Sequence, residues 1–415
     1  MPRIVFQGAN LLDGDQPARA QSTVVVEGDR ITAVGRGRKL EKLEPRPDDR
    51  VVDLGGKTLM PGLVSCHFHA SYHDITIQPE PLGVEKPPGY LMLCAAQNAR
   101  TALDCGITSY ASAGANAGNI DADLRMAIED GIVEGPRILA GSKGLDTHGG
   151  YTDTEKWWWE LGNKGAQRFA SGADEFRRVV RDEIKKGAGM IKIFLSGGHA
   201  VPHFAGGMSL SRAELDAVLE TAHERGAKVR AHCAWRNVIL EAVQAGLDVV
   251  DHGDQLDEAC IEAMARARTF LVPSMFFTWQ MLSPQAALAL ATEEQMAPLR
   301  AEFDNMVRRV PEAQRAGVRM VVGDDYGIIV LRHGRYAEEL EFYVKTVGIA
   351  PLDVLRWATK NGGELMGLPV GTIEEGRLAD LLVVDGDPSV DIAVLQDRQK
   401  LRAIVKGGRF VKDAL

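Results

Sequence analysis

The sequence predicts an α/β protein: a (β/α)8 TIM barrel with a small β-sandwich domain built from both ends of the chain. Three observations point to this fold class. Between residues 60 and 365, short apolar runs alternate with segments of helical periodicity, which is typical of βα units around a parallel sheet. Residues 1–59 and 366–415 carry short β-rich runs, and neither end has enough apolar residues for its own core. The 415-residue chain is long enough for both domains.

Eight candidate strands follow one another in the central region. Many of their apolar positions are β-branched, as in strands that are covered on both faces. Amphipathic segments separate them, and one of these begins with Ser211 and carries Glu214 three residues later, which is a capping-box pattern. Eight βα units favour a closed barrel over an open sheet. The predicted strands are 62–67, 107–111, 137–141, 190–196, 228–233, 247–252, 269–274 and 318–325.

The two ends of the chain have a similar β-rich texture, and glycines separate their runs. We predict that 1–59 and 366–415 form the small β-sandwich domain and that 60–365 form the barrel. The predicted terminal strands are 4–6, 22–26, 30–34, 51–54, 381–384, 401–405 and 409–411.

Charge and cysteine content restrict the class of protein. The net charge is -9 and no long Lys/Arg run occurs, so we expect no nucleic-acid or membrane-surface partner. No apolar stretch is long enough for a membrane span, and the N-terminus lacks the pattern of a signal peptide. The five cysteines form no C-x-x-C pair, which favours free thiols in a reducing compartment. We therefore expect a cytoplasmic protein.

Polar residues mark the predicted carboxyl ends of the barrel strands, where catalytic groups of this fold lie. His67 and His69 end the first strand. Strand alternation points both imidazoles to the same side, so both can reach one metal ion. A pair of ordinary loop histidines is the alternative interpretation.

Lys192 lies inside the apolar strand 190–196, where a buried ammonium group is unfavourable. It needs an anionic partner, a lowered pKa or covalent conversion. Addition of CO2 would give an anionic carbamate that can bridge two metals. An amine that reaches the barrel rim or pairs with a carboxylate is the alternative, and Lys192 taken alone favours it.

His232 and His252 end consecutive predicted strands, and an Asp at 324 or 325 follows the last one. Core histidines held by neighbours are commoner than metal ligands, but two on consecutive strands favour ligation. A carboxylate at the rim can bind a cation and accept a proton. With His67, His69 and Lys192, these residues provide about the ligands that two cations about 3.5–4 Å apart require.

The motifs around these residues resemble those of the amidohydrolase superfamily. In this chain, PGLVSCHFH resembles the family's opening motif and KIFLSGG resembles its strand-4 lysine motif. AHC and DHG resemble its two histidine motifs, and GDDYG resembles its aspartate motif. Residues 358–381 resemble the return into the family's small β-domain. The likeness covers nearly the whole chain. It is nearest to the imidazolonepropionase-related, prolidase-like branch, with dipeptidases, ochratoxin-type amidases, and phenylurea and thiocarbamate hydrolases.

The resemblance implies two divalent metal ions, which we expect to be zinc, and a CO2-derived carbamate on Lys192 that bridges them. It implies that a metal-bridging hydroxide hydrolyses a C–N bond in an amide, peptide, urea or carbamate. The resemblance implies that the metal ligand is Asp325 and not Asp324, and that Asp325 transfers the proton of the water to the leaving nitrogen. The implied metal ligands are His67, His69, Lys192, His232, His252 and Asp325; Asp325 and Lys192 are the implied catalytic residues.

Substrate-side residues are less specific. His148 and His199 follow the third and fourth strands, and Trp235 lies just after His232. Some dipeptidase relatives carry Tyr two residues after that histidine, whereas this chain has Ala there, which points to an apolar or aromatic small-molecule substrate. The run Trp157–Trp159 could line a pocket, but we favour a subunit interface and so expect a homo-oligomer.

Two other functions are alternatives to metal-dependent C–N hydrolysis. A mononuclear deaminase of the same fold usually carries H-x-x-E after the fifth strand and lacks the strand-4 lysine. This chain has Trp235 where that Glu would stand, and it keeps Lys192. A non-catalytic scaffold homologue typically loses metal ligands, whereas this chain keeps all six. Both alternatives are therefore less favoured than hydrolysis.

Overall fold

The computed structural model describes residues 3–36, 46–76, 82–115, 118–156, 158–159, 165–199, 201, 207–283 and 293–415, with only the backbone given for 293–295. The chain forms two compact units. One comprises Met1–Ser65, Arg100–Tyr110 and Gly334–Leu415, and the other comprises Cys66–Ala99 and Ala111–His333. The domain boundaries at 59/60 and 365/366 stay a prediction.

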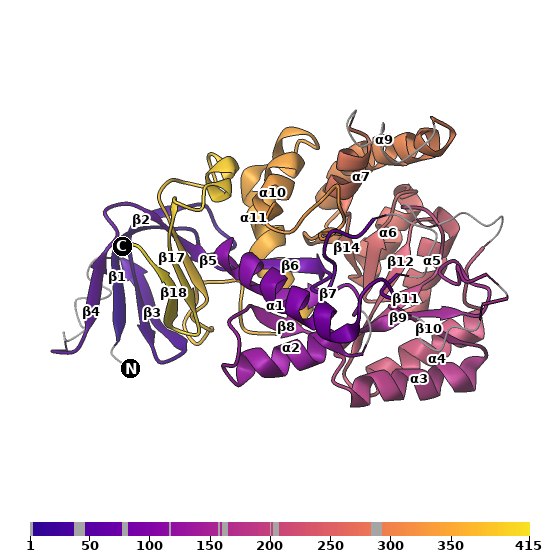
Figure 1. Cartoon of the computed structure of the whole chain (residues 1–415). Helices are drawn as coiled ribbons and strands as arrows, with labels where there is room; N and C mark the ends of the chain where they lie inside the picture. The colour runs from indigo at the N-terminus through magenta and orange to yellow at the C-terminus, as the bar shows by residue number, and fades with distance from the viewer. Residues whose placement is uncertain are drawn as a thin grey trace. The chain divides into compact units, whose positions relative to one another are not determined.

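The first unit contains one mixed sheet to which both ends of the chain contribute, as the sequence predicts (Figure 1). Neighbouring strands are antiparallel, except that β1 pairs in parallel with β4 and β5. In sheet order the strands are β18 (Arg409–Asp413), β17 (Leu401–Lys406), β16 (Leu381–Val384), β5 (Thr58–Pro61), β1 (Ile4–Leu11), β2 (Arg19–Glu27) and β3 (Arg30–Arg36), with β4 (Arg50–Asp53) beside β1.

The core of this unit is apolar and follows the two-residue period of a strand. Residues two apart share one face of a strand, and such pairs from four strands meet in one buried cluster: Ile4 and Phe6, Val24 and Val26, Leu381 and Val383, Ala403 and Val405. The rings of Phe6 on β1 and Phe410 on β18 lie 6.2 Å apart although these strands are not neighbours in the sheet. The sheet therefore curves around a shared core.

Short helices complete the described part of the first unit. They are α10 (Tyr336–Lys345), α11 (Pro351–Arg356), the π-helix η2 (Trp357–Asn361), α12 (Gly362–Met366) and the 3-10 helix η3 (Ile392–Gln396).

The second unit is built around a seven-stranded parallel sheet. The register places His232 beside Phe194 and His252 beside Cys233, so the ends of three successive strands lie in one layer. In sheet order the strands are β10 (Gln167–Ala170), β9 (Gly141–Thr147), β11 (Met190–Phe194), β12 (Lys228–Cys233), β13 (Val249–His252), β14 (Phe270–Val272) and β15 (Arg319–Met320).

A three-stranded sheet contains β6 (Leu63–Phe68), β7 (Ile107–Ser112) and β8 (Arg137–Leu139). Within the second unit, backbone hydrogen bonds join the extensions of these strands to the seven-stranded sheet. The Cys66 N–H donates to the Val322 carbonyl, and the Ala115 N–H donates to the Ser142 carbonyl. These bonds link the two sheets within the second unit.

Helices alternate with the strands, and α3 and α4 lie side by side (Figure 1). The capping box is confirmed: the Ser211 side chain accepts from the Glu214 N–H, and the Glu214 side chain accepts from the Ser211 N–H. The helices are α1 (Pro88–Asp104), α2 (Ile120–Glu129), α3 (Ala173–Lys185), α4 (Arg212–His223), α5 (Arg236–Ala245), α6 (Glu258–Ala267), α7 (Met275–Met281) and α9 (Glu293–Arg315).

The last predicted strand is shorter than expected. Of 318–325, only Arg319–Met320 forms a strand, β15. Gly323 has a φ of +139°, and a Cβ atom there would lie 2.2 Å from the backbone nitrogen of His67. The chain leaves the strand conformation before Gly323, which passes against β6. After Gly323, the side chains of residues 324 and 325 have different surroundings.

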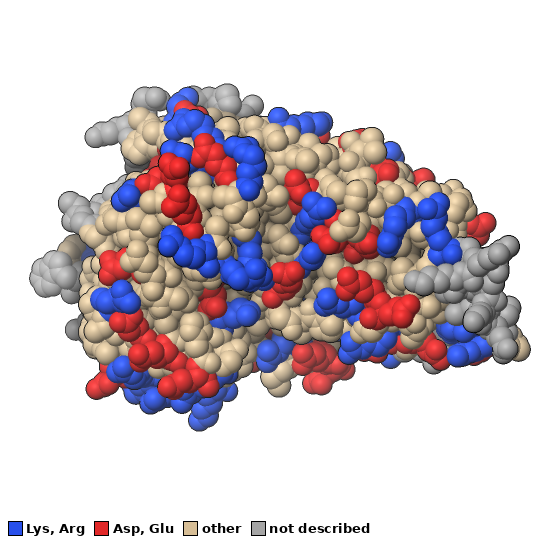
Figure 2. Space-filling model, turned by 180° about the vertical axis from the view of Figure 1, so that it is seen from behind, with Lys and Arg blue, Asp and Glu red and all other residues tan. Residues whose placement is uncertain are grey.

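Acidic and basic side chains intermix on the face shown in Figure 2. Among the described helices, none is long and apolar enough to cross a membrane.

Candidate metal centre

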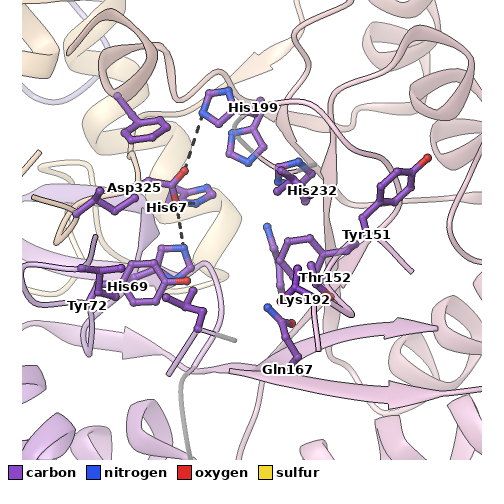
Figure 3. A pocket seen from close by; sticks show the side chains of 18 of the residues that line it. His67, His69, Tyr72, Tyr151, Thr152, Gln167, Lys192, His199, His232 and Asp325 are labelled. Carbon is purple, nitrogen blue, oxygen red and sulfur yellow. Dashed lines mark hydrogen bonds and ion pairs between the residues drawn. The ribbon is translucent and has the colours of Figure 1, made fainter. Parts of the chain in front are cut away.

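A cavity of about 450 Å³ in the second unit collects most of the predicted site residues (Figure 3). It lies at the carboxyl ends of the parallel strands, because β6, β11, β12 and β13 each end at or near a lining residue. Its polar lining includes His67, His69, Lys192, His199, His232, His252 and Asp325.

The first group of potential ligands consists of His67, His69 and Asp325. The Nε2 atoms of the two histidines lie 3.1 and 3.2 Å from Oδ1 of Asp325. The Nδ1 atom of His69 lies 3.1 Å from the Gly114 carbonyl, and Nδ1 of His67 lies 3.3 Å from Oδ1 of Asp251. The Arg230 guanidinium, a donor, also lies 3.2 Å from Nδ1 of His67. These contacts hold both rings with Nε2 facing Asp325, and a cation between them would be bound by all three side chains.

The second group consists of His199, His252 and Asp325, whose ligand atoms lie within 4.8 Å of one another. Nε2 of His199 is 3.9 Å from Oδ2 of Asp325. The rings of His199 and His252 stack at 3.8 Å. Asp325 thus presents Oδ1 to the first group and Oδ2 to the second, which is how a carboxylate can serve two cation positions.

The two neighbouring aspartates have different surroundings. Asp324 is fully buried, and its Oδ2 accepts hydrogen bonds from the N–H groups of Phe276 and Phe277 at the start of α7. Its Oδ1 accepts from the Asp325 N–H. Asp324 therefore anchors a helix, whereas the Asp325 carboxylate lines the cavity.

Lys192 points into the cavity from β11 (Figure 3). Its Nζ lies 2.6 Å from Oδ2 of the buried Asp251. The guanidinium of the fully buried Arg230 also binds Asp251, and it donates to the carbonyls of Cys66 and Ser112. The lysine thus pairs with a carboxylate, which is the alternative interpretation of the sequence. Arg230 donates to both oxygens of the same carboxylate.

His232 lies beside the second group. Its ring is 4.5 Å from that of His252, and its Nε2 lies 3.1 Å from the Gly198 carbonyl. Gly198 has a φ of +96°, and a Cβ atom there would lie 2.6 Å from the side chain of Ala234. A glycine is therefore needed for the loop after β11 to bring this carbonyl to β12.

Two of the histidines have strained backbones. The φ angles of His199 and His252 are +48° and +73°, in the left-handed region that residues other than glycine rarely adopt, with Asn, Asp and His the most frequent among them. Such strain persists only where the surrounding structure enforces it, and it concentrates at functional sites. The strained conformation directs both imidazoles toward Asp325.

The protonation states of His232, His252 and Asp325 suit cation binding. Burial lowers the pKa of His232 to about 3, and it lowers that of His252 well below the usual histidine value. Burial lowers the pKa of His199 as well, but the carboxylates of Asp254 and Asp325 raise it to about 9, so a cation at His199 would displace a proton. Burial opposes ionisation of Asp325, but His67 and the hydrogen bond from His69 hold its pKa well below the usual range. Neutral imidazoles and ionised carboxylates are the forms that bind metals.

Unsatisfied polar atoms also indicate a cation. Among the described residues, Nε2 of His199 and Nδ1 of His252 are buried with no hydrogen-bond partner. Orphaned buried nitrogens are unfavourable, and ligation would satisfy them. The described residues therefore fit a site for divalent cations.

The rest of the cavity wall is mainly apolar or aromatic. The Tyr72 ring stacks on His69 at 4.0 Å. Among the described lining residues, Glu85 is the one charged side chain besides those already named. The other lining residues are Ile75, Thr76, Leu82, Val84, Tyr151, Thr152, Thr154, Gln167, Phe194, Val201, Phe277 and Ile328.

The predicted substrate residues have different positions. His199 lines the cavity. His148 is exposed, and its Nδ1 lies within hydrogen-bond distance, 2.9 Å, of the Ser171 hydroxyl. Trp235 contacts Tyr151 edge to face at 5.7 Å without lining the cavity itself. Of the tryptophan run, Trp157 lies outside the described residues, and Trp158 is 60% exposed.

Sequence reasoning missed Arg230, Asp251 and Asp254. Arg230 carries a usable signal, since it is a charged residue inside the apolar run 228–233, as Lys192 is in its own strand. Asp251 and Asp254 flank His252 in the motif DHGD. A carboxylate near a predicted histidine ligand is a candidate to orient it.

The profile of the amidohydrolase family matches residues 58–411. The chain belongs to the amidohydrolase family. Ochratoxinase of Aspergillus niger is 27% identical to this amidohydrolase over 433 residues, which cover 99% of this chain and 86% of ochratoxinase. The family resemblance drawn from the sequence motifs is confirmed.

Solved structures of several hydrolases are similar to this chain over nearly its whole length. A prolidase in complex with N-methylphosphonate-L-proline is 29% identical, with a TM-score of 0.86 over 99% of this chain and 100% of that one. The structure of Aspergillus niger ochratoxinase gives a TM-score of 0.86 at 26% identity, covering 99% and 96%. Phenylurea hydrolase B, at 21% identity and a TM-score of 0.76 over 99% and 97%, shares the fold.

Proposed function

We propose that this amidohydrolase hydrolyses a C–N bond in an amide, peptide, urea or carbamate with two divalent cations. The observation that carries the proposal is the convergence of two His–His–Asp groups on the shared Asp325 in one cavity. Histidine and carboxylate ligands suit zinc, which we propose as the metal. The proposed family ligands are His67, His69, Lys192, His232, His252 and Asp325.

The cations would supply Lewis acidity toward the scissile carbonyl and lower the pKa of the attacking water. Side chains of the protein would then transfer the proton. Asp325 lies beside His67 and His69 at 17% exposure, so its carboxylate can reach both the bound cations and a molecule in the cavity. We assign it the proton taken from the water and delivered to the leaving nitrogen.

Lys192 is proposed to act as a carbamate. Burial lowers its pKa, Asp251 raises it and Arg230 lowers it, and a neutral amine is the form that adds CO2. Addition of CO2 to the neutral amine forms an N–C bond, releases one proton and leaves an anionic carbamate, and the side chain already lines the cavity together with His232 and His252. Asp251 would keep Arg230 as its cationic partner.

The cavity wall supports an apolar or aromatic substrate group. Tyr72, Ile75, Phe194, Phe277 and Ile328 surround the site, and burial of such surface stabilises a bound apolar group. The prolidase relative binds a proline phosphonate, so acyl-proline compounds belong in a screen with aryl amides and arylureas.

The finer architecture is also proposed. The hydrogen bonds at Cys66 and Ala115 support a closed (β/α)8 barrel within 60–365, and the shared core supports a sandwich-like domain of 1–59 and 366–415. The exposed Trp158 supports a homo-oligomer. The cytoplasmic location stays a prediction from the sequence.

Lys192→Ala tests the bridging role. The variant should lose bound metal and hydrolysis together, since the bridging anion is gone, and short-chain carboxylates should restore part of both. Metal content and hydrolysis of the best amide, urea or dipeptide substrate are measured with and without acetate. Normal hydrolysis by Lys192→Ala would refute the assignment.

A further inference from the structure

We infer that His199 is a metal ligand in addition to the six proposed above, and that Asp254 orients it. The inference rests on the proposed two-cation site. His199 follows β11 in the loop that carries Gly198, and it is 4% exposed.

The first argument is that His199 shares the orientation of His67 and His69. In all three, an oxygen acceptor lies beside Nδ1, which is Oδ1 of Asp254 at 3.1 Å for His199. At His67 the Nη2 atom of Arg230 lies beside Nδ1 as well. In all three, Nε2 faces Asp325. A carboxylate that holds one ring nitrogen while the other binds metal is a recurrent arrangement at metal sites.

The second argument is that the free nitrogen has a place for a cation. Nε2 of His199 is buried without a hydrogen-bond partner among the described residues. It forms a potential ligand group with His252 and Asp325. His232, the histidine expected from the sequence, instead directs Nε2 to the Gly198 carbonyl. Among the described residues, the second potential ligand group therefore contains His199, whereas His232 lines the cavity beside it.

The third argument is that the structure holds this histidine firmly. Reciprocal backbone bonds between Gly198 and Val201 fix the turn, and His199 itself has a φ of +48°. Asn305 donates to the Asp254 carbonyl, and the buried Glu302 interacts with the His199 backbone. So many supports for a strained residue favour a role that requires one fixed orientation.

The test is a metal titration of four proteins: wild type, His199→Asn, Asp254→Asn and His223→Asn. Asparagine tolerates the left-handed conformation at 199. His223 is the matched control, because it is exposed and also pairs with a carboxylate, Asp248 at 2.8 Å, outside the cavity. Each protein is stripped by chelation and titrated with Co2+, following bound metal and the visible absorption of the cobalt.

We expect His199→Asn to bind the second Co2+ more than about 100-fold more weakly and to change its absorption spectrum. Asp254→Asn should weaken the same step by about 10–100-fold, the usual range for a residue that orients a ligand. His223→Asn should match wild type. Thermal melting of the metal-free proteins checks that each variant folds.

Unchanged Co2+ affinity and spectrum in folded His199→Asn would overturn the inference, even if its KM rises, because that combination belongs to a substrate contact. Failure of the proposed two-cation site gives a different result, because the wild-type protein would then bind fewer than two equivalents of Co2+. If His199→Asn does not fold, Asp254→Asn decides alone, and an affinity equal to wild type overturns the inference.

Discussion

Both units bury apolar residues, but they differ in the clusters that their buried side chains form. The sheet of the first unit encloses a cluster of apolar residues such as Phe6 and Leu381. The second unit buries Lys192, Arg230 and Asp251 beneath its histidines, each at 3% exposure or less. Buried charges are costly unless paired. The apolar cluster of the first unit therefore stabilises the fold by burial alone, whereas the charged cluster of the second unit depends on the pairing of its members.

The largest expected effect separates the two neighbouring aspartates. Asp325→Asn should lower kcat/KM by about 10³-fold, within the 10²–10⁴ range for loss of a proton-transfer group. It should lose less metal than activity, because the histidine ligands remain. Asp324→Asn should mainly lower thermal stability, because its carboxylate binds the start of α7. Steady-state kinetics and metal analysis of both variants test this, and a reversed ranking would move the catalytic assignment to Asp324.

Arg230→Met tests the charged interior. The substitution keeps an extended apolar stem but leaves the buried Asp251 with less positive charge around it. We expect a loss of about 3–5 kcal/mol in the free energy of unfolding, as for other buried pairs that lose one partner. Denaturant unfolding measures it. A loss below about 1 kcal/mol would mean that the pair behaves like an exposed one.

Leu381→Ala tests the apolar interior. This residue is fully buried on β16, and truncation of a buried leucine costs about 2–5 kcal/mol. The melting temperature should fall, while kcat/KM below the transition should stay within about twofold of wild type, since every proposed ligand lies in the other unit. A large loss of kcat/KM with unchanged stability would contradict the division between the two interiors.

The sequence predicted elements whose signals are local. The strands β7 and β12 and the capping box at Ser211 follow from periodicity and neighbouring residues. It missed the strand β5 (Thr58–Pro61), which pairs with β16, more than 300 residues away. Such partners leave no local pattern. The length of the last strand was also wrong, because the close approach of Gly323 to His67 is a tertiary contact.

The site shows the same limit. Motif spacing located the histidines and Lys192, since each stands at or near a strand end. It could not rank His199 above His148, because both are loop histidines after strands. The difference between them is the burial of one beside Asp254 and the exposure of the other beside Ser171, which only the folded chain reveals.

The central claim is that the polar interior of the second unit holds two cations. The most direct test is the metal content of freshly purified wild-type protein by plasma mass spectrometry. We predict about two equivalents of a transition metal per chain, as in other two-metal hydrolytic sites. One equivalent would favour a mononuclear enzyme and reopen deamination. No bound metal after metal-supplemented expression would contradict the account and favour a non-catalytic scaffold.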